Sequence, residues 1–413
     1  MIGAGAAGLA AAAELASAGR RVVILEARER IGGRCWTHRL PGVSAPVELG
    51  AEFIHGRPES TLRLLKRADI ATLDSVRSSL YAAGGKLVPI EPFAEAARAV
   101  RGAVLHEDIS FATFLARRRL AERTRTFARL MVQGFDAADP ARVSAQSIVE
   151  EWGGGASIGS SQPRPASGYG PMLERLAAEA LARGAQLRLQ AVVRRVRWQP
   201  GAVHVEGEFL GERFVHTARR AIVTLPLGVL QAGAVRFEPA LREKRKALAQ
   251  LASGPVVKAA LRFAHPFWEK LSPGTAFFHS PRASFPTFWT PLPARVPLLI
   301  GWAGGPKAER LGRLSEPKLI QEALSGVRGL FGKVPPVHAA LVHDWRRDPF
   351  AHGAYSYVLV GGRGARETLA SPIADTLFFA GEATDADDSG TVGGALASGE
   401  RAARQVLEAS PSN

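Results

Sequence analysis

A glycine-rich run at the start of the chain constrains its fold more than any other feature of the sequence. Gly3, Gly5 and Gly8 have the spacing of a dinucleotide-binding turn, and the alanine-rich stretch from Ala7 to Ala18 predicts the helix that follows such a turn. In this motif the first glycine permits the tight turn, the second lets the backbone approach a pyrophosphate, and the third lets the helix pack on a strand. The helix N-terminus then offers N–H groups to the phosphate oxygens. The run therefore predicts a nucleotide-binding βαβ unit.

The residues after this helix complete the second half of that unit. Gly19 predicts the end of the helix, and residues 21–26 have the continuous apolar pattern of a buried parallel strand. Glu26 ends the strand about twenty residues after the turn, where an acid accepts hydrogen bonds from ribose hydroxyls. Only Met1 and Ile2 precede the turn, although the fold needs a strand there. We therefore expect a missing N-terminal segment, for instance through a start codon assigned too late.

Composition narrows the class of protein. The 413 residues are 46% hydrophobic, which is typical of a soluble globular chain with two domains, and we expect a cytoplasmic monomer or homodimer. The single cysteine, Cys35, excludes an intrachain disulfide and a multi-cysteine metal cluster, and we predict no metal site. The net charge is +15, but the arginines are spread along the chain, so we expect no nucleic-acid partner. No apolar run reaches the roughly 20 residues that a membrane span needs, so we expect no membrane anchor.

The patterns along the rest of the chain predict an α/β protein with two interleaved domains. Apolar residues recur at helical spacing through much of residues 60–150, whereas residues 168–260 return to alternating helices and strands. We predict a discontinuous Rossmann-like domain from residues 1–60, 168–258 and 345–413. Residues 61–167 and 259–344 would form an inserted α+β substrate domain, with a helical lobe at about residues 61–150.

The residues after Glu26 identify the nucleotide. Gly32, Gly33 and Arg34 continue the signal, and with them the sequence resembles the flavin-containing amine oxidase family, which includes monoamine oxidases, polyamine oxidases and lysine-specific histone demethylases. The resemblance implies an FAD-binding domain of the GR2 type, in which this segment wraps the flavin side of the cofactor. Arg28 and Arg34 match positions that contact FAD, and the anionic pyrophosphate gives arginine a physical role there.

Two further blocks carry the resemblance toward the flavin ring. Residues 48–56 match a segment that runs beneath the ring, and His55 matches a histidine of animal polyamine and spermine oxidases, although a packing histidine is an equal alternative. Lys258 lies in an apolar strand pattern, where a lysine is costly to bury without a partner. The matching lysine of the family holds a water against flavin N5. The alternative is an ordinary lysine on an edge strand.

The last two blocks lie near the C-terminus. Tyr355 matches an aromatic wall that faces the flavin and can guide an amine through cation–π attraction, although core packing is the alternative. Ala354 stands where monoamine oxidases carry the cysteine that bonds to flavin, so FAD should be non-covalent. Glu382 matches an acid near the pyrophosphate and ribityl groups, and Thr391 with Val392 would open a helix whose dipole stabilises reduced flavin. Thr391 replaces the second cage tyrosine of monoamine oxidases, which favours the polyamine oxidase and demethylase branch.

Carried over position by position, the resemblance implies a site of twenty-two residues or more, in which Lys258 and Tyr355 are the catalytic candidates. It assigns substrate contacts to His55, Tyr355 and Thr391. It assigns cofactor contacts to Gly3, Gly5, Ala6, Ala7, Gly8, Glu26, Ala27, Arg28, Gly33, Arg34, Gly50, Ala51, Glu52, Phe53, Val193, Gly381, Glu382, Thr391, Val392 and Ala395.

The activity implied is the oxidation of an amine C–N bond by hydride transfer to flavin N5. The imine would hydrolyse to an aldehyde and an amine, and dioxygen would be reduced to hydrogen peroxide. Glu52, Asp385, Asp387 and Asp388 could make the entrance acidic and favour cationic amines. The alternatives are an L-amino-acid oxidase, a desaturase-like or protoporphyrinogen oxidase-like flavoenzyme, and a catalytically impaired flavoprotein. We do not expect a chromatin demethylase, because the chain has no room for the extra helical modules of those enzymes.

Overall fold

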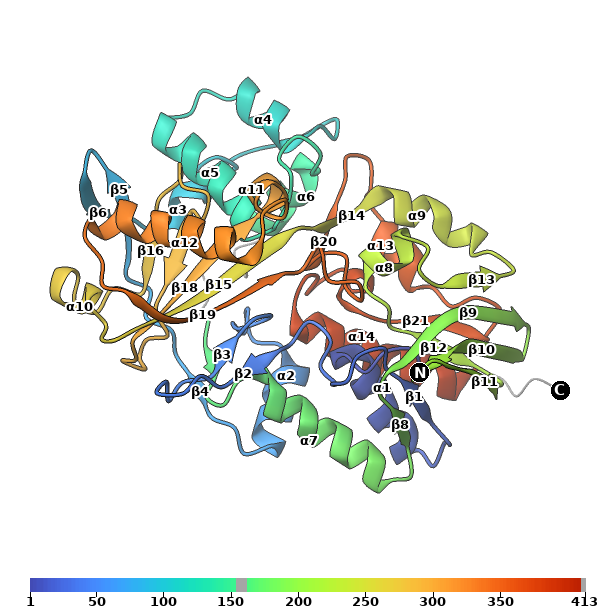
Figure 1. The fold of residues 1–413 in the computed structure, drawn as a ribbon. Coiled ribbons are helices and arrows are strands. Elements are labelled where there is room, and N and C mark those ends of the chain that lie inside the picture. Colours follow the sequence, from blue (N-terminus) through green and yellow to red (C-terminus); the bar gives the residue numbers. More distant parts are fainter. Residues whose placement is uncertain (154–161, 410–413) are drawn as a thin grey trace.

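The computed structural model describes residues 1–153 and 162–409 and has the α/β fold that the sequence predicts. In Figure 1 the blue N-terminal and red C-terminal segments lie together in the lower part, and the teal, yellow and orange segments form the upper part. Residues 154–161 of the predicted substrate domain and residues 410–413 lie outside the described part of the chain.

A parallel β-sheet carries the glycine turn. Its strands are β1 (Val23–Leu25), β8 (Gln186–Arg188), β12 (Ala221–Val223) and β21 (Leu377–Phe379). Strand β1 pairs with β8, and β12 pairs with β21, both in parallel. Ile2 forms parallel bridges to Leu25 and to Val223, so it takes the place of a strand between the two pairs. The chain passes from this bridge directly into the glycine turn, at the edge where a Rossmann-like sheet binds its nucleotide.

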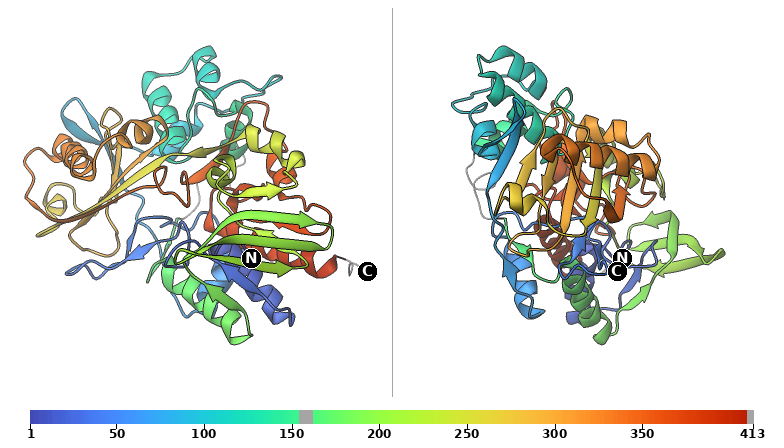
Figure 2. Two further views of the ribbon diagram at one scale, coloured as in Figure 1. Left: turned by 45° about the vertical axis from the view of Figure 1, so that its right-hand side comes forward. Right: turned by 60° about the vertical axis from the view of Figure 1, so that its left-hand side comes forward.

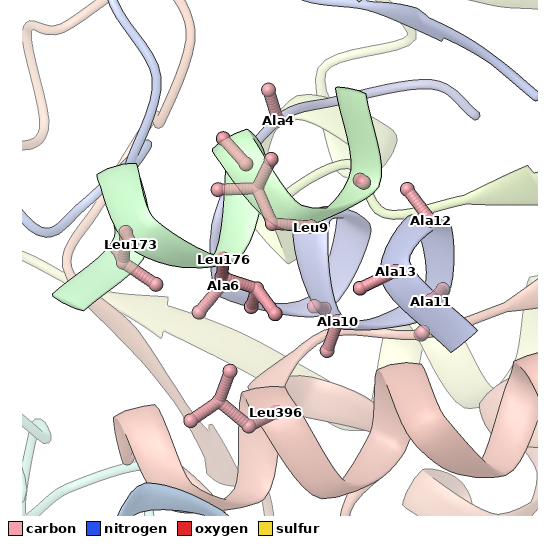
Figure 3. Packing of buried hydrophobic residues seen from close by; sticks show 14 of the residues in the cluster. Ala4, Ala6, Leu9, Ala10, Ala11, Ala12, Ala13, Leu173, Leu176 and Leu396 are labelled. Atoms are coloured by element: carbon pink, nitrogen blue, oxygen red, sulfur yellow. The ribbon is translucent and has the colours of Figure 1, made fainter. Parts of the chain in front are cut away.

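Helix α1 (Ala6–Ser17) follows the turn and forms the centre of the lower core. It packs against α7 (Tyr169–Ala182) and α14 (Val392–Glu408). Figure 3 shows its alanine side chains beside Leu173 and Leu176 of α7 and Leu396 of α14, and their small size lets the three helices approach closely. Gly8 is needed for the same reason, because a Cβ there would lie 2.1 Å from the carbonyl oxygen of Gly3.

A seven-stranded sheet dominates the upper half, in the order β19-β15-β18-β17-β16-β5-β6. Its strands are β5 (Ser79–Ala83), β6 (Lys86–Pro89), β15 (Val256–Phe263), β16 (Phe277–His279), β17 (Thr287–Trp289), β18 (Leu298–Gly304) and β19 (Val337–Asp344). Two of these strands, β5 and β6, come from a stretch that the sequence pattern predicted to be mostly helical. They join the sheet because β5 pairs in parallel with β16, a partner nearly two hundred residues away in the chain.

The faces of β15 explain how Lys258 is oriented. Val257, Ala259 and Leu261 pack with the apolar side of α12 (Glu316–Phe331), which Figure 1 shows lying over the sheet. Side chains alternate along a strand, so Lys258 and Ala260 point to the opposite face. Strand β15 lies between β18 and β19, so the alternative of an edge-strand lysine is wrong.

The helical lobe lies at the top of both views in Figure 2. It consists of α3 (Pro92–Ala97), α4 (Phe111–Arg117), α5 (Glu122–Gly134) and α6 (Ala145–Gly153). One apolar cluster, which includes Phe111, Met131 and Ile148, holds the lobe together. The same cluster takes in Tyr357 of β20 (Tyr355–Val358), so the lobe packs directly on the strand that begins with Tyr355.

The other elements surround these two halves. Four strands form an antiparallel and parallel sheet on the side of the lower half, drawn in green in Figure 2: β9 (Ala191–Gln199), β10 (Ala202–Phe209), β11 (Glu212–Ala218) and β13 (Arg236–Glu238). The remaining helices are α2 (Glu59–Arg67), α8 (Leu227–Gln231), α9 (Arg245–Gln250), α10 (Trp268–Leu271), α11 (Gly305–Leu311), α13 (Ala365–Ala370) and the short turns η1 (Arg242–Lys244) and η2 (Glu382–Thr384). The remaining strands are β2 (Thr37–His38), β3 (Val47–Glu48), β4 (Thr72–Leu73), β7 (Arg164–Pro165) and β14 (Leu251–Gly254).

Within residues 1–153 and 162–409, no helix has the length and apolar character needed to cross a bilayer. The division into two interleaved domains stays a prediction, and β15 begins at Val256, inside the segment that we assigned to the Rossmann-like domain.

Candidate cofactor and substrate site

A cavity of about 1280 Å³ lies between the two halves of the molecule. It reaches from the glycine turn past the end of β1 to Lys258 on β15, Tyr355 on β20 and the start of α14. All of the predicted site residues line it except Gly8, which is buried behind the turn. The other predicted residues on the wall are Gly3, Gly5, Ala6, Ala7, Glu26, Ala27, Arg28, Gly33, Arg34, Gly50, Ala51, Glu52, Phe53, His55, Val193, Lys258, Tyr355, Gly381, Glu382, Thr391, Val392 and Ala395.

The glycine turn has the shape of a pyrophosphate cradle. Gly5 is the N-cap of α1, and no described side chain caps the helix there, so its first N–H groups remain available to an anion. A Cβ on Gly5 would lie 4.0 Å from the Cα of Gly33, in the gap between the turn and the second glycine segment. The side chain would therefore occupy space that a cofactor needs, and the residues present fit a dinucleotide.

Glu26 stands at the cavity wall with both carboxylate oxygens partly used. It accepts hydrogen bonds from the backbone N–H groups of Ala4, at 2.7 Å, and Arg28, at 2.9 Å. Burial raises the pKa of this carboxyl group, while the two N–H groups and the charges of Arg28 and Arg30 oppose the rise. A carboxylate has about four acceptor positions, so two remain for ribose hydroxyls.

The two predicted cofactor arginines are fixed by acids of the protein. Arg28 makes a bidentate pair with Asp348, at 2.9 and 2.6 Å. Arg34 donates to the carbonyl oxygen of Ala354 at 2.6 Å and to Glu382 at 2.8 Å. Both guanidinium groups are thus held at the cavity wall before any ligand binds, which lowers the entropy that a cofactor must remove on binding.

Lys258 is completely buried, and its partner is Glu52. The Nζ atom donates to Glu52 Oε2 at 2.7 Å and to the Gly50 carbonyl at 3.2 Å. It lies 5.1 Å from the ring centre of Trp289 and 5.9 Å from that of Trp302, within the range of cation–π attraction. The buried lysine is therefore compensated, and one of its three N–H groups is left for a ligand or a water.

Glu52 does not make the entrance acidic, which corrects one expectation from the sequence. Its other oxygen, Oε1, accepts hydrogen bonds from Arg164 and Trp289, each at 2.9 Å. Burial alone would raise the pKa of Glu52, but the charges of Lys258 and Arg164 and the hydrogen bonds from Lys258 and Trp289 lower it below its usual value. With two cations around one anion, this group carries a net positive charge.

Tyr355 lies on the cavity wall and is anchored at the end of α5. Its hydroxyl donates to the carbonyl oxygen of Phe135 at 2.6 Å. Trp302 donates to the neighbouring carbonyl, that of Gly134, at 2.7 Å. Burial and the nearby carboxylates raise the pKa of Tyr355 well above its usual value, so the phenol stays neutral.

His55 is a neutral ring among aromatic neighbours. It makes an edge-to-face contact with Phe135, with ring centres 5.3 Å apart. Burial lowers the pKa of His55 to about 4, and its Nδ1 atom has no hydrogen-bond partner among residues 1–153 and 162–409. A ring nitrogen in this position can accept a hydrogen bond from a ligand in the cavity.

The start of α14 faces the cavity as expected. Thr391 is its N-cap, and its hydroxyl oxygen accepts from the Gly394 N–H at 2.9 Å and donates to the Asp388 carbonyl at 2.7 Å. The hydroxyl is therefore engaged in capping, and the positive end of the helix dipole is directed at the cavity. Asp387 and Asp388 of the preceding loop also line the wall.

Cys35 and Ala354 both line the cavity, and neither offers an attachment point for a cofactor. Ala354 has no reactive side chain. Burial raises the pKa of the Cys35 thiol to about 12, so this cysteine is not a thiolate and is a poor nucleophile.

Sequence reasoning missed several residues on the wall. Asp136 follows α5, Glu151 lies in the last turn of α6, and His279 ends β16. None of them stands in a motif or at a telling spacing, and only the packing of the helical lobe on β20 brings the two acids to the cavity. The two tryptophans around Lys258 were missed for the same reason, since they lie on strands that only pair in the folded sheet.

Comparisons with known proteins were made on this geometry. The family model described as flavin containing amine oxidoreductase matches residues 6–91 and 89–407. A lysine-specific histone demethylase 1B of Mus musculus is 28% identical over 98% of this chain and 52% of the relative. Polyamine oxidase 3 of Oryza sativa subsp. japonica is 30% identical over 98% of this chain and 88% of the relative. The chain thus spans about half the length of that demethylase.

A solved structure of wild-type putrescine oxidase bound to putrescine has the same fold. It superposes with a TM-score of 0.83 at 22% identity and covers 98% of both chains. The likeness extends over both halves of the molecule, including the inserted sheet and the helical lobe.

Substitution of Gly5 by valine should remove the cofactor and leave the fold intact. Gly5 has φ −75° and ψ −177°, which valine also adopts, and its Cβ would meet only ordinary contacts. The added side chain would occupy the cradle, so cofactor affinity should fall by about tenfold or more, since overpacking costs about 1–3 kcal/mol. Circular dichroism should match the wild type while flavin absorbance is lost.

Gly8→Val is the matched control for this variant. Its side chain would clash with the carbonyl oxygen of Gly3, so it should lower the thermal stability of the whole protein. A Gly5→Val protein that purifies with a full complement of flavin would contradict the assignment of the cradle.

Proposed function

The chain belongs to the family of flavin-containing amine oxidoreductases, whose cofactor is FAD, and from that premise we propose that it oxidises an amine with dioxygen as the electron acceptor. The observation that carries the proposal is the continuity of one cavity from the cradle at Gly5 to Lys258 and Tyr355. A cofactor held at the cradle and along the wall would present its far end to those two side chains.

FAD supplies the redox chemistry: it takes a hydride from the carbon next to the amine nitrogen and passes the electrons to dioxygen, which becomes hydrogen peroxide. The resulting imine takes up water and separates into an aldehyde and an amine. The protein contributes binding, orientation and electrostatics.

We propose that Lys258 holds the water of this site. Two of its N–H groups are occupied by Glu52 and Gly50, and the rigid contacts of the ammonium with two indole rings fix the direction of the third. A water bound there would be placed beside the reacting atoms for imine hydrolysis or for the return of electrons to dioxygen. The positive charge of the group also favours negative charge on a reduced cofactor.

We propose that Tyr355 forms the aromatic wall of the amine site, with His55 as a neutral acceptor across from Phe135. The tyrosine keeps its ring in place through its bond to the Phe135 carbonyl. A flat aromatic face attracts the amine in its cationic form and limits its approach by shape.

The amino-acid oxidase alternative has less support. Such an enzyme needs a cation free to bind the substrate carboxylate. Arg164 is a buried arginine near Lys258, but its donors go to Glu52, Leu292 and Thr290, and it does not line the cavity. A flavoprotein without catalytic activity is the remaining alternative, and the first experiment below decides against or for it.

Anaerobic addition of an amine should bleach the flavin absorbance of the purified protein, and air should restore it with formation of hydrogen peroxide. The screen should contain polyamines, aryl-alkyl monoamines and amino acids. A protein whose flavin stays oxidised with every member of this screen would count as a non-catalytic flavoprotein.

Replacement of Lys258 by methionine should leave FAD bound and slow turnover by about tenfold or more, the smaller end of what a positioned proton-transfer or water-holding group contributes. Folding should survive because Glu52 keeps Arg164 and Trp289 as partners. Steady-state and stopped-flow rates measure the effect. Lys307→Met is the control, since Lys307 is half-buried in the same half of the molecule but lies off the cavity. Equal rates in the Lys258 and Lys307 variants would remove Lys258 from the mechanism.

Tyr355→Ala should raise KM for amines by about 2- to 30-fold, the range of a cation–π contact, with a smaller effect on kcat. Tyr355→Phe keeps the aromatic face and loses only the bond to Phe135, so its KM should stay near that of the wild type. If the phenylalanine variant is as impaired as the alanine variant, the hydroxyl rather than the ring is what matters.

A further inference from the structure

Two carboxyl groups on the cavity wall have no part in the mechanism proposed above. Asp136 directly follows the end of α5, and Glu151 lies in the last turn of α6. Their side chains are hydrogen-bonded to each other. Asp136 is only 9% exposed, and its Oδ2 atom has no hydrogen-bond partner in the described part of the chain. A buried acceptor without a partner is costly, so a ligand that donates a hydrogen bond there would relieve the cost.

The backbone around this acid pair also favours a cation. The C-terminal ends of α5 and α6 meet here, and each carries the negative end of a helix dipole. Both helices belong to the lobe at the top of Figures 1 and 2. The last carbonyls of α5 accept bonds from Trp302 and Tyr355, so the acid pair lies next to the proposed amine site.

The charges that face the pair are mostly negative. Arg366 is the cation beside Glu151, and its Nη1 and Nη2 donate to Ser356. Glu382, Asp385 and Glu367 also act on Arg366, and of these Glu382 is already paired with Arg34. This end of the cavity is therefore acidic, in contrast to the net charge of +15 on the whole chain.

We propose that Asp136 and Glu151 bind a second ammonium group, so that the substrate is a small aliphatic oligoamine with amines at both ends. The proposal rests on the proposed amine oxidation at Tyr355 and Lys258. One amine lies against Tyr355 for oxidation, and the other reaches the acid pair and holds the chain in the cavity.

The state of the pair matches a single ammonium. Burial and the neighbouring charge of Glu151 raise the pKa of Asp136 well above its usual value, so the two groups share one proton and carry one negative charge between them. An incoming ammonium supplies the donors that Asp136 Oδ2 lacks and compensates that charge. A neutral alkyl end in the same place would leave both needs unmet.

The test compares 1,4-diaminobutane with n-butylamine, which has the same carbon chain and no second amine. In the wild type, kcat/KM for flavin reduction should be about 10- to 100-fold higher for the diamine, the range of a charged hydrogen bond. In the double variant Asp136→Asn, Glu151→Gln this preference should disappear, with the n-butylamine rate within about twofold of the wild type. Glu122→Gln, at the opposite end of α5, is the control and should keep the preference.

Thermal unfolding of the oxidised protein provides a second measurement that does not need turnover. Diaminobutane should raise the melting temperature of the wild type and not that of the double variant, and n-butylamine should raise neither. If no amine bleaches the flavin, the proposed function fails, and a diamine-specific shift that depends on the pair would still support the binding site.

Three results would overturn the proposal and leave amine oxidation intact. The first is equal kcat/KM for the diamine and the monoamine in the wild type. The second is a double variant that loses activity toward both amines alike. The third is a dimethyl-lysine peptide that is turned over in preference to the diamine with the same dependence on Asp136, because the second cation would then belong to a peptide.

Discussion

The carboxylate of Glu52 joins parts of the chain that nothing else connects so directly. It accepts hydrogen bonds from Lys258 on β15, Trp289 on β17 and Arg164 on β7, while Glu52 itself belongs to the segment that passes beneath the proposed flavin. Loss of one member of a buried ion pair leaves the other charge uncompensated and costs about 3–5 kcal/mol. The seven-stranded sheet and the nucleotide-binding half are therefore held in register by charge at the very place where the chemistry is proposed.

The parts of the site that were predicted from sequence are those encoded by local pattern. The turn at Gly3, the acid at Glu26 and the helix that begins at Val392 each depend on backbone geometry within a few residues, which spacing and residue type reveal. The parts that were missed depend on long-range pairing. Lys258 was found, but its partner lies 206 residues away in the chain, and the sequence pattern assigned Glu52 to an acidic entrance instead. Strands β5 and β6 were missed because a short strand is stabilised by its neighbours rather than by its own sequence.

The distribution of charge gives a second example of the limits of composition. A chain with a net charge of +15 seems unsuited to a cationic substrate. The arginines, however, are spread over the surface or paired inside, as Arg28 is with Asp348 and Arg34 with Glu382. The field inside a cavity depends on the groups that line it and on the helix ends directed at it. Whole-chain charge therefore says little about the preference of an enclosed site.

The end of α5 has a consequence for any change of specificity. Its carbonyls at Gly134 and Phe135 are bonded to Trp302 and Tyr355, which come from two other strands. The aromatic wall, the cage around Lys258 and the helical lobe thus form one mechanical unit. A protein engineer who enlarges the cavity by moving any one of them would displace the other two, so a broader substrate range would require coordinated replacements on α5, β18 and β20.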